Sequence, residues 1–272
     1  MKISNKCNIG CSFCHENSKP EGNIADFEKW KPFLRTLHVG TELALGGGAI
    51  SSIPSNDFQK FLEFLKEIGI NTNITINQKE LEDSAFLENI KTYIKHKLIR
   101  GIGISFTGKS AVLEELVKRY KERIVIHVIN GIVSEDDISY LSSLNCKILI
   151  LGYKNFGRGL SYLNKFDKII ENNQKFIKDN ILEIAYKFKS VSFDCLAVEQ
   201  LDLKHGINEN DWERLYMGDD GSHTMYIDLV EGTYGVNSTS PKGSRQILNP
   251  TDKIEDIFKN VRSASCGIYS RE

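Results

Sequence analysis

Three cysteines stand within eight positions near the start of the chain, in the segment CNIGCSFCHENS at residues 7–18. Cys7, Cys11 and Cys14 follow the spacing C-x3-C-x2-C, which lets one loop direct three sulfurs at a small inorganic centre. Cysteine thiolates hold iron–sulfur clusters, and a cubane cluster ligated by protein alone needs four of them. A structural zinc site also needs four ligands, usually as two separated pairs.

A fourth ligand at a suitable spacing is absent from the sequence. His15 adjoins Cys14, and neighbouring residues seldom point at one metal ion without strain. Cys146, Cys195 and Cys266 are far apart, and we expect ordinary buried thiols there, because free cysteine packs as a small hydrophobic residue. The pattern favours a [4Fe–4S] cluster with one open iron over zinc. An open coordination position is where a metal centre does chemistry.

The segments after this loop alternate between strand and helix patterns. Short runs that are often β-branched predict six strands, at Lys2–Ser4, Glu42–Leu45, Asn71–Ile76, Gly101–Phe106, Ile124–Ile129 and Lys147–Leu151. Apolar residues at helical spacing predict the helices that follow them, at Ile24–Leu37, Asn56–Ile68, Lys79–Lys95, Ser110–Arg119, Glu135–Leu144 and Tyr162–Asp179. Ser134, followed by three acidic residues, is typical of a helix N-cap.

Six strand–helix units in succession predict an α/β fold with a parallel sheet, because each return to a parallel neighbour crosses over through a helix. Periodicity alone leaves an open doubly wound sheet and a partial barrel as alternatives. In both folds the ligand site lies at the carboxyl ends of the strands.

The pattern changes after about residue 180. Four further features are predicted there: a strand at Ser190–Ala197, a short helix at Trp212–Tyr216, a β-hairpin of His223–Leu229 with Thr233–Ser238, and a terminal helix at Ile254–Val261. No low-complexity linker precedes them. We therefore expect residues 1–180 to form the main domain and residues 181–272 to form an α+β extension that packs on it and shapes substrate choice.

Composition excludes several classes of function. The formal net charge is −1, with 35 Lys and Arg against 36 Asp and Glu, so a general nucleic-acid or membrane surface is not expected. The first residues lack the apolar region of a secretory signal, and no apolar run approaches the ~18 residues of a transmembrane helix. Without an export signal, clustered cysteines favour metal or redox chemistry over disulfides. We expect a cytoplasmic protein.

The cysteine loop, with Phe13 just before its third cysteine and a predicted strand before its first, resembles the signature loop of the radical S-adenosylmethionine (SAM) enzymes. The resemblance covers roughly residues 1–156. It implies a partial (β/α)6 barrel of the TIM type, with a [4Fe–4S] cluster on the three cysteines and SAM bound at the open iron. It also implies a low-potential electron donor such as flavodoxin or ferredoxin. Reduction of the cluster would cleave SAM to a 5′-deoxyadenosyl radical, which abstracts hydrogen from the substrate.

The resemblance also implies contacts to SAM. Gly46, Gly47 and Gly48 end the second predicted strand, where the family has a Gly-Gly-Glu segment that contacts the methionyl amino group. Gly48 stands at the glutamate position, so a backbone contact can survive but a carboxylate contact cannot. Matching the later strand ends gives further candidates: Thr75 or Asn77 and Ser105 for the carboxylate or ribose, His127 and Asn130 on the fifth strand, and Leu151 and Gly152 for adenine. A tight turn, a barrel lining or a capping role is the alternative for each.

Two features concern the substrate. Tyr153, Lys154 and Arg158, after the sixth predicted strand, either bind an anionic substrate group or belong to a solvated loop. Cys195, near the end of a predicted strand, is a candidate catalytic thiol that donates a hydrogen atom.

The substrate class stays open between small molecules, nucleotides and peptides, and activation of another enzyme's glycyl radical is a further possibility. Because the chain begins at its first strand, we expect no N-terminal peptide-binding module, which disfavours a peptide-modifying enzyme that relies on one. The alternative from another class is a non-catalytic protein, either an iron–sulfur electron carrier or a zinc-binding interaction module.

Overall fold

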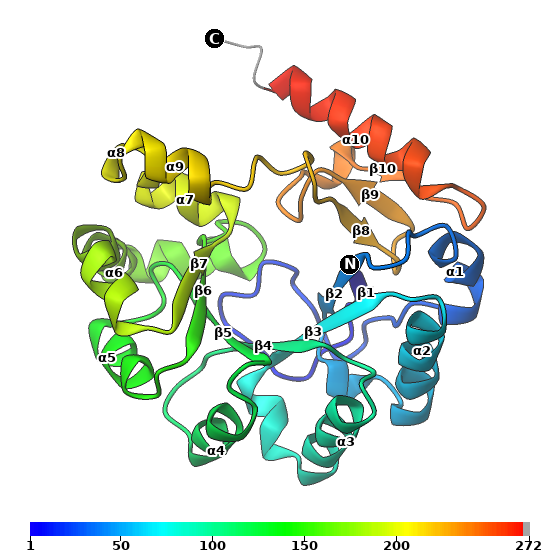
Figure 1. Cartoon of the computed structure of the whole chain (residues 1–272), viewed down its shortest axis with the longest axis horizontal. Helices are drawn as coiled ribbons and strands as arrows, with labels where there is room; N and C mark the ends of the chain where they lie inside the picture. Colours follow the sequence, from blue (N-terminus) through cyan, green and yellow to red (C-terminus); the bar gives the residue numbers. More distant parts are fainter. Residues whose placement is uncertain (269–272) are drawn as a thin grey trace.

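One mixed sheet organises the protein, which a computed structural model describes over residues 1–268, with side chains described through residue 263. The strands lie in the order β10-β9-β8-β1-β2-β3-β4-β5-β6-β7 and curve into a partial TIM-type barrel (Figure 1). Their bounds are β1 Lys2–Ser4, β2 Glu42–Gly47, β3 Asn71–Asn77, β4 Gly101–Ser105, β5 Ile124–Ile129, β6 Lys147–Leu151, β7 Ser190–Phe193, β8 Tyr226–Asp228, β9 Thr233–Gly235 and β10 Gln246–Ile247.

Helices follow the parallel strands and cover the outer face of the sheet (Figure 1). The α-helices are α1 Phe27–Leu34, α2 Ser55–Glu67, α3 Ser84–Lys95, α4 Ala111–Tyr120, α5 Glu135–Ser143, α6 Arg158–Lys187, α7 Cys195–Leu201, α8 Leu203–Gly206, α9 Glu209–Leu215 and α10 Ile254–Ile268. Short 3₁₀ turns are η1 Ile50–Ser52, η2 Gln78–Glu82 and η3 Lys242–Ser244. Within the described residues, none of the helices is long and apolar enough to cross a membrane.

Alternation along the strands separates a buried outer layer from the barrel interior. In β3, Ile74 and Ile76 are almost fully buried, while Thr75 and Asn77 on the opposite face are partly exposed. Successive strand residues point to opposite faces, so the apolar ones pack outward under the helices and the polar ones face inward. The inward face is therefore free to carry chemistry at the strand ends.

The six predicted strand–helix units are confirmed, and a seventh parallel strand follows them. β7 pairs in parallel with β6. The predicted strand Ser190–Ala197 was too long: it ends at Phe193, because the Asp194 side chain accepts a hydrogen bond from the Ala197 backbone and N-caps α7. The predicted single helix Lys79–Lys95 is wrong for a similar reason, since Asp83 caps a new helix and separates η2 from α3.

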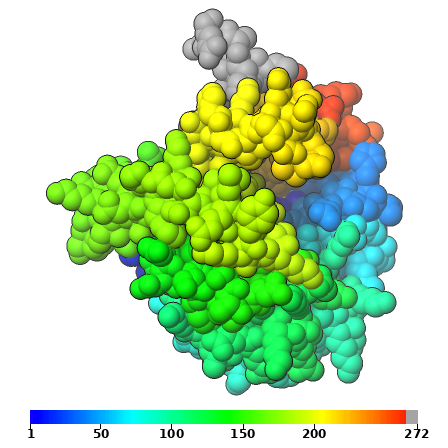
Figure 2. Space-filling view, turned by 60° about the vertical axis from the view of Figure 1, so that its left-hand side comes forward, coloured from blue at the N-terminus to red at the C-terminus, as the bar shows by residue number. Residues whose placement is uncertain are grey.

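The C-terminal segment continues the same sheet. β8 and β9 form the predicted antiparallel hairpin, and β8 also pairs in parallel with β1 at Lys2 and Asp228. The chain passes from α9 to β8 across the gap between the two edges of the curved sheet, and α10 covers the outside of the hairpin (Figure 1). Seen from the side of α6, the helices α7–α9, in yellow-green and yellow, stand above the barrel wall (Figure 2).

Candidate functional site

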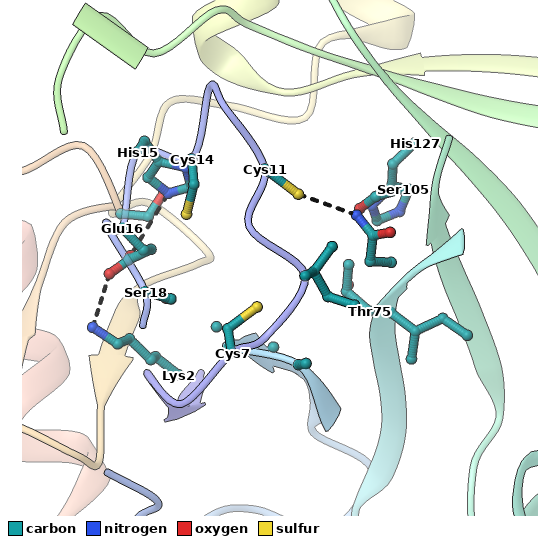
Figure 3. Close-up of a pocket in the computed structure, with 18 of the residues that line it drawn as sticks. Lys2, Cys7, Cys11, Cys14, His15, Glu16, Ser18, Thr75, Ser105 and His127 are labelled. Atoms are coloured by element: carbon teal, nitrogen blue, oxygen red, sulfur yellow. Dashed lines mark hydrogen bonds and ion pairs between the residues drawn. The ribbon is translucent and has the colours of Figure 1, made fainter. Parts of the chain in front are cut away.

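The three clustered cysteines line one pocket at the carboxyl ends of the parallel strands, which we term the central pocket (Figure 3). Its volume is about 390 Å³, which is in the range of small-molecule sites. Of the residues proposed from the sequence it is lined by Cys7, Cys11, Phe13, Cys14, Gly46, Gly47, Gly48, Thr75, Asn77, Ser105, His127, Leu151 and Lys154. The structure thus brings together the cysteine loop and the ends of β2 to β6.

Arg158, the first residue of α6, holds the cysteine loop in place. Its Nε donates to the carbonyl of Cys11 at 2.9 Å, and its Nη1 donates to the carbonyl of Ser18 at 3.0 Å. Its backbone N–H also donates to the carbonyl of Cys14 at 3.0 Å. The sequence offered Arg158 as a possible anion-binding side chain, but its guanidinium is engaged with backbone carbonyls of the loop.

Glycine at position 157 lets the loop after β6 approach the cysteine loop closely. Gly157 has φ +58°, and a Cβ added there would overlap the backbone of His15. Only glycine combines this left-handed conformation with so close an approach. The two loops therefore form one packed unit that fixes the positions of the thiols.

Three polar side chains from neighbouring strands form a row along the pocket. The register pairs Asn77 of β3 with Ser105 of β4, and Ser105 with His127 of β5. The Asn77 amide donates toward the Sγ of Cys11 at 3.5 Å, as the dashed line in Figure 3 marks. Its carbonyl oxygen caps η2 by accepting from the Lys79 N–H, so Asn77 links the strand end to the cysteine loop.

His127 is held as a neutral imidazole. Burial lowers its pKa from 6.5 to about 4, because the charged form loses hydration there. Its ring lies over Gly103 of β4, where an added Cβ would overlap the ring atoms. Burial also favours the neutral form of the Cys11 thiol and so raises its pKa, and the neighbouring cysteines act in the same direction.

The triple glycine serves close backbone packing as well as lining the pocket. The N–H groups of Gly46 and Gly48 donate to the carbonyls of Met1 and Ser4. A Cβ at Gly48 would overlap the Lys6 backbone, so no side chain fits there. These two N–H groups therefore donate to the segment before the cysteine loop and not to a ligand.

Lys2 and Glu16 form the opposite wall of the pocket, together with Tyr226 from the C-terminal segment. The Lys2 ammonium lies 2.8 Å from the Glu16 carboxylate and 3.0 Å from that of Asp228. Tyr226 of β8 donates to Glu16 at 3.3 Å. Burial works against the charge on Lys2, but Glu16 and Asp228 outweigh it and raise the Lys2 pKa.

The three thiols do not converge on one point of the pocket (Figure 3). No three His, Cys, Asp or Glu side chains are placed to hold one ion anywhere in residues 1–263, whose side chains are described. A tetrahedral ion with Zn–S bonds of ~2.3 Å would need the sulfurs close together, whereas the three thiols stand around the pocket (Figure 3). Ser18 Oγ, also buried in this lining, has no hydrogen-bond partner in the protein. Three thiols and a free hydroxyl around a cavity fit a cluster better than one ion.

The remaining predicted residues lie beside the central pocket or away from it. Gly152 lines a small adjoining cavity with Leu151 and Tyr153. Asn130 is fully buried, lines neither cavity and donates to Gln200 at 3.2 Å, so it has a structural role.

Cys195 begins α7 instead of ending a strand, and it lines neither cavity. Burial and the nearby Asp220 raise its pKa to about 12. Cys146 is buried as expected, and the side chain of Cys266 lies outside the described residues.

Sequence reasoning missed Lys2, Tyr226 and the C-terminal Ser238, which line the pocket together with Glu16. The signals in the sequence were a lysine at the start of the short strand Lys-Ile-Ser and a glutamate two residues after the third cysteine. Neither position indicates that β8 would lie beside β1.

The chain resembles known proteins mainly in its fold. No family model matches it. It is 27% identical over 217 residues to the uncharacterized protein MJ0907 of Methanocaldococcus jannaschii, which covers 77% of this chain and 67% of that protein. Solved structures of anSMEcpe with bound AdoMet and the Cp18Cys or Kp18Cys peptide superpose with TM-scores of 0.59 and 0.60 at 12% and 13% identity, over 96% of this chain and 80% of theirs.

Proposed function

We propose that this chain is a radical SAM enzyme, which holds a [4Fe–4S] cluster on Cys7, Cys11 and Cys14, cleaves SAM reductively and uses the 5′-deoxyadenosyl radical to abstract hydrogen from a substrate. One observation carries the proposal: three thiols of a single loop line a pocket at the carboxyl end of a partial barrel. The same fold occurs in anSMEcpe, a radical SAM enzyme solved with bound AdoMet. When bound, the cluster would supply one electron to SAM from a low-potential donor such as flavodoxin or ferredoxin.

Neutral polar groups and backbone would hold SAM on the β2–β6 side of the pocket. Thr75, Ser105 and the neutral His127 offer hydrogen-bonding groups without a competing charge. Backbone groups at Gly46 and Leu151 border the same space. These residues would orient SAM, since a fixed orientation of the reacting groups lowers the entropic barrier to reaction.

The C-terminal segment would close the opposite side of the pocket and exclude water. Tyr226 and Ser238 reach the lining from β8 and from the turn after β9. Exclusion of water protects a reactive radical from side reactions. The substrate would therefore enter between SAM and this segment.

Anaerobic reconstitution tests the proposal. We expect about four iron and four sulfide per chain, together with 5′-deoxyadenosine released from SAM under reducing conditions. Cys11→Ala should lose the cluster and reduce SAM cleavage to background, whereas Cys146→Ala, a thiol far from the loop, should retain both. Stoichiometric zinc, a cluster that ignores SAM, or cleavage by the Cys11 variant would contradict the proposal.

A further inference from the structure

Lys154 places a cation in the central pocket without an ionic partner. The residue follows β6, and its Nζ donates to Ser238 Oγ at 2.9 Å and lies 3.5 Å from His15 Nε2. Among the described residues, no carboxylate lies within ion-pair distance of this ammonium. Burial lowers the Lys154 pKa, while Asp194, Glu16 and Asp220 act in the opposite direction from beyond ion-pair distance. A buried ammonium is stable only where an anion or good hydrogen-bond acceptors meet it.

The other two cations on this wall are already matched. Lys2 contacts both Glu16 and Asp228, and the Arg245 guanidinium lies 3.8 Å from Asp228 and over the ring of Tyr226. Of these three cations, Lys154 alone has no carboxylate within ion-pair distance among the described residues.

The turn that carries Ser238 is fixed before any ligand arrives. Arg245 donates to the carbonyls of Ser238 and Ser240 at 3.1 and 3.2 Å. The Asn237 side chain accepts from the Thr239 N–H at 3.0 Å and donates to Asp220 at 2.8 Å. A preformed hydroxyl next to an ammonium loses little freedom on binding, which favours affinity.

We propose that Lys154 and Ser238 form a subsite for an anionic group of the substrate, a carboxylate or a phosphate, where the loop after β6 meets the C-terminal segment at the central pocket. The inference rests on the proposed function for its assignment to a substrate. Lys154 Nζ has a free donor in addition to the one given to Ser238, because an ammonium has three. The Ser238 hydroxyl, which accepts from Lys154, can donate to the same anion. Together they would hold the anionic end of the substrate beside the C-terminal segment and direct its other end toward SAM.

The test measures binding of simple anions to the reconstituted protein saturated with SAM. Inorganic phosphate and acetate are titrated separately by calorimetry at low ionic strength, which distinguishes a phosphate site from a carboxylate site. We expect one of them to bind, and Lys154→Gln to weaken that binding by about tenfold or more, since hydrogen bonds to charged groups have this strength. Lys154→Arg should retain binding, and Lys168→Gln, at an exposed lysine of α6, should match the wild type.

Affinity for SAM, iron content and melting temperature are measured on the same samples. SAM affinity that stays within twofold in Lys154→Gln supports a substrate subsite, whereas loss of SAM binding would mean that Lys154 holds SAM and would overturn the proposal. Equal anion binding in Lys154→Gln, or none in the wild type, would also overturn it. If the wild type assembles no cluster, the proposed function fails by itself, and the titration of the cluster-free protein still decides whether Lys154 binds anions.

Discussion

At the scale of single residues, the site depends on glycines that leave space as well as on the side chains that line the pocket. Gly103 leaves the space into which the His127 ring folds, and Gly48 leaves room for the backbone before the cysteine loop. A side chain at Gly103 would displace His127, which lines the pocket, and one at Gly48 would displace the Lys6 backbone just before Cys7. Small residues here determine where the larger ones stand.

His127 should make the stability of the protein depend on pH. Its pKa falls from 6.5 in the unfolded chain to about 4 in the folded one, so between these values only the unfolded chain binds the proton. The free energy of unfolding should therefore fall as pH drops from 7 to 4, by about 3 kcal/mol from this group. His127→Gln should remove that part of the slope in urea unfolding measured across the range.

The slope should not vanish in His127→Gln, because burial lowers the pKa of His15 to about 4 as well. An unchanged slope in His127→Gln would show that the imidazole is hydrated and chargeable in the folded protein.

At the scale of elements, local patterns predicted most of the barrel. β5 and β6 match their predicted bounds, since β-branched runs ended by polar residues leave little choice. Ser134 caps α5 as expected, with Asp137 completing the capping box. The failures are at caps inside apolar patterns: Asp83 and Asp194 each begin a helix where the apolar period seemed to continue.

The same local patterns predicted the part of the site that lies on β3, β4 and β5. Strand alternation and parallel pairing bring Thr75, Ser105 and His127 into one pocket, as reasoning from strand ends predicted. It could not place Lys154 against Ser238, because that contact joins residues 84 positions apart in different supersecondary units. Contacts between the two edges of the sheet have no periodic signal in the sequence.

The contact between the loop after β6 and the cysteine loop gives a prediction at this scale. Arg158→Gln removes the guanidinium that donates to the carbonyls of Cys11 and Ser18. Charge-assisted hydrogen bonds of this kind stabilise by ~1.5–3 kcal/mol each, so the cluster should be lost on the order of tenfold faster to an iron chelator. The rate is followed by the loss of visible absorbance under anaerobic conditions.

The matched control is Arg119→Gln, since Arg119 lies exposed on α4 far from the loop. It should release iron at the wild-type rate. Equal rates in both variants would indicate that the cysteine loop keeps its shape without Arg158. A large drop in melting temperature for Arg158→Gln would instead point to a role in the whole fold.

At the scale of the whole molecule, the first and last parts of the chain depend on each other. β1, the strand before the cysteine loop, pairs with β2 on one side and with β8 on the other. Without the C-terminal hairpin, β1 would therefore be an edge strand. The Trp30 indole of α1 donates to the Leu229 carbonyl at 2.8 Å and reinforces this junction. The C-terminal segment therefore supports the site structurally in addition to lining it.

Lys2 is the charged centre of that junction, and its removal should destabilise the entire fold. Lys2 is 3% exposed and Asp228 is 0% exposed, so Lys2→Met leaves a buried carboxylate without its nearest cation. Breaking a buried pair in this way costs about 3–5 kcal/mol, measured as the loss in free energy of unfolding in urea. Adding Asp228→Asn should recover part of the loss, because the amide oxygen can still accept from the Val230 N–H without carrying charge.

The control is Lys175→Met, which breaks an exposed ion pair on α6 and should cost under ~1 kcal/mol of unfolding free energy. A loss as small in Lys2→Met would mean that water reaches Asp228 and that the Lys2–Asp228 pair adds little to the junction between the two ends of the chain.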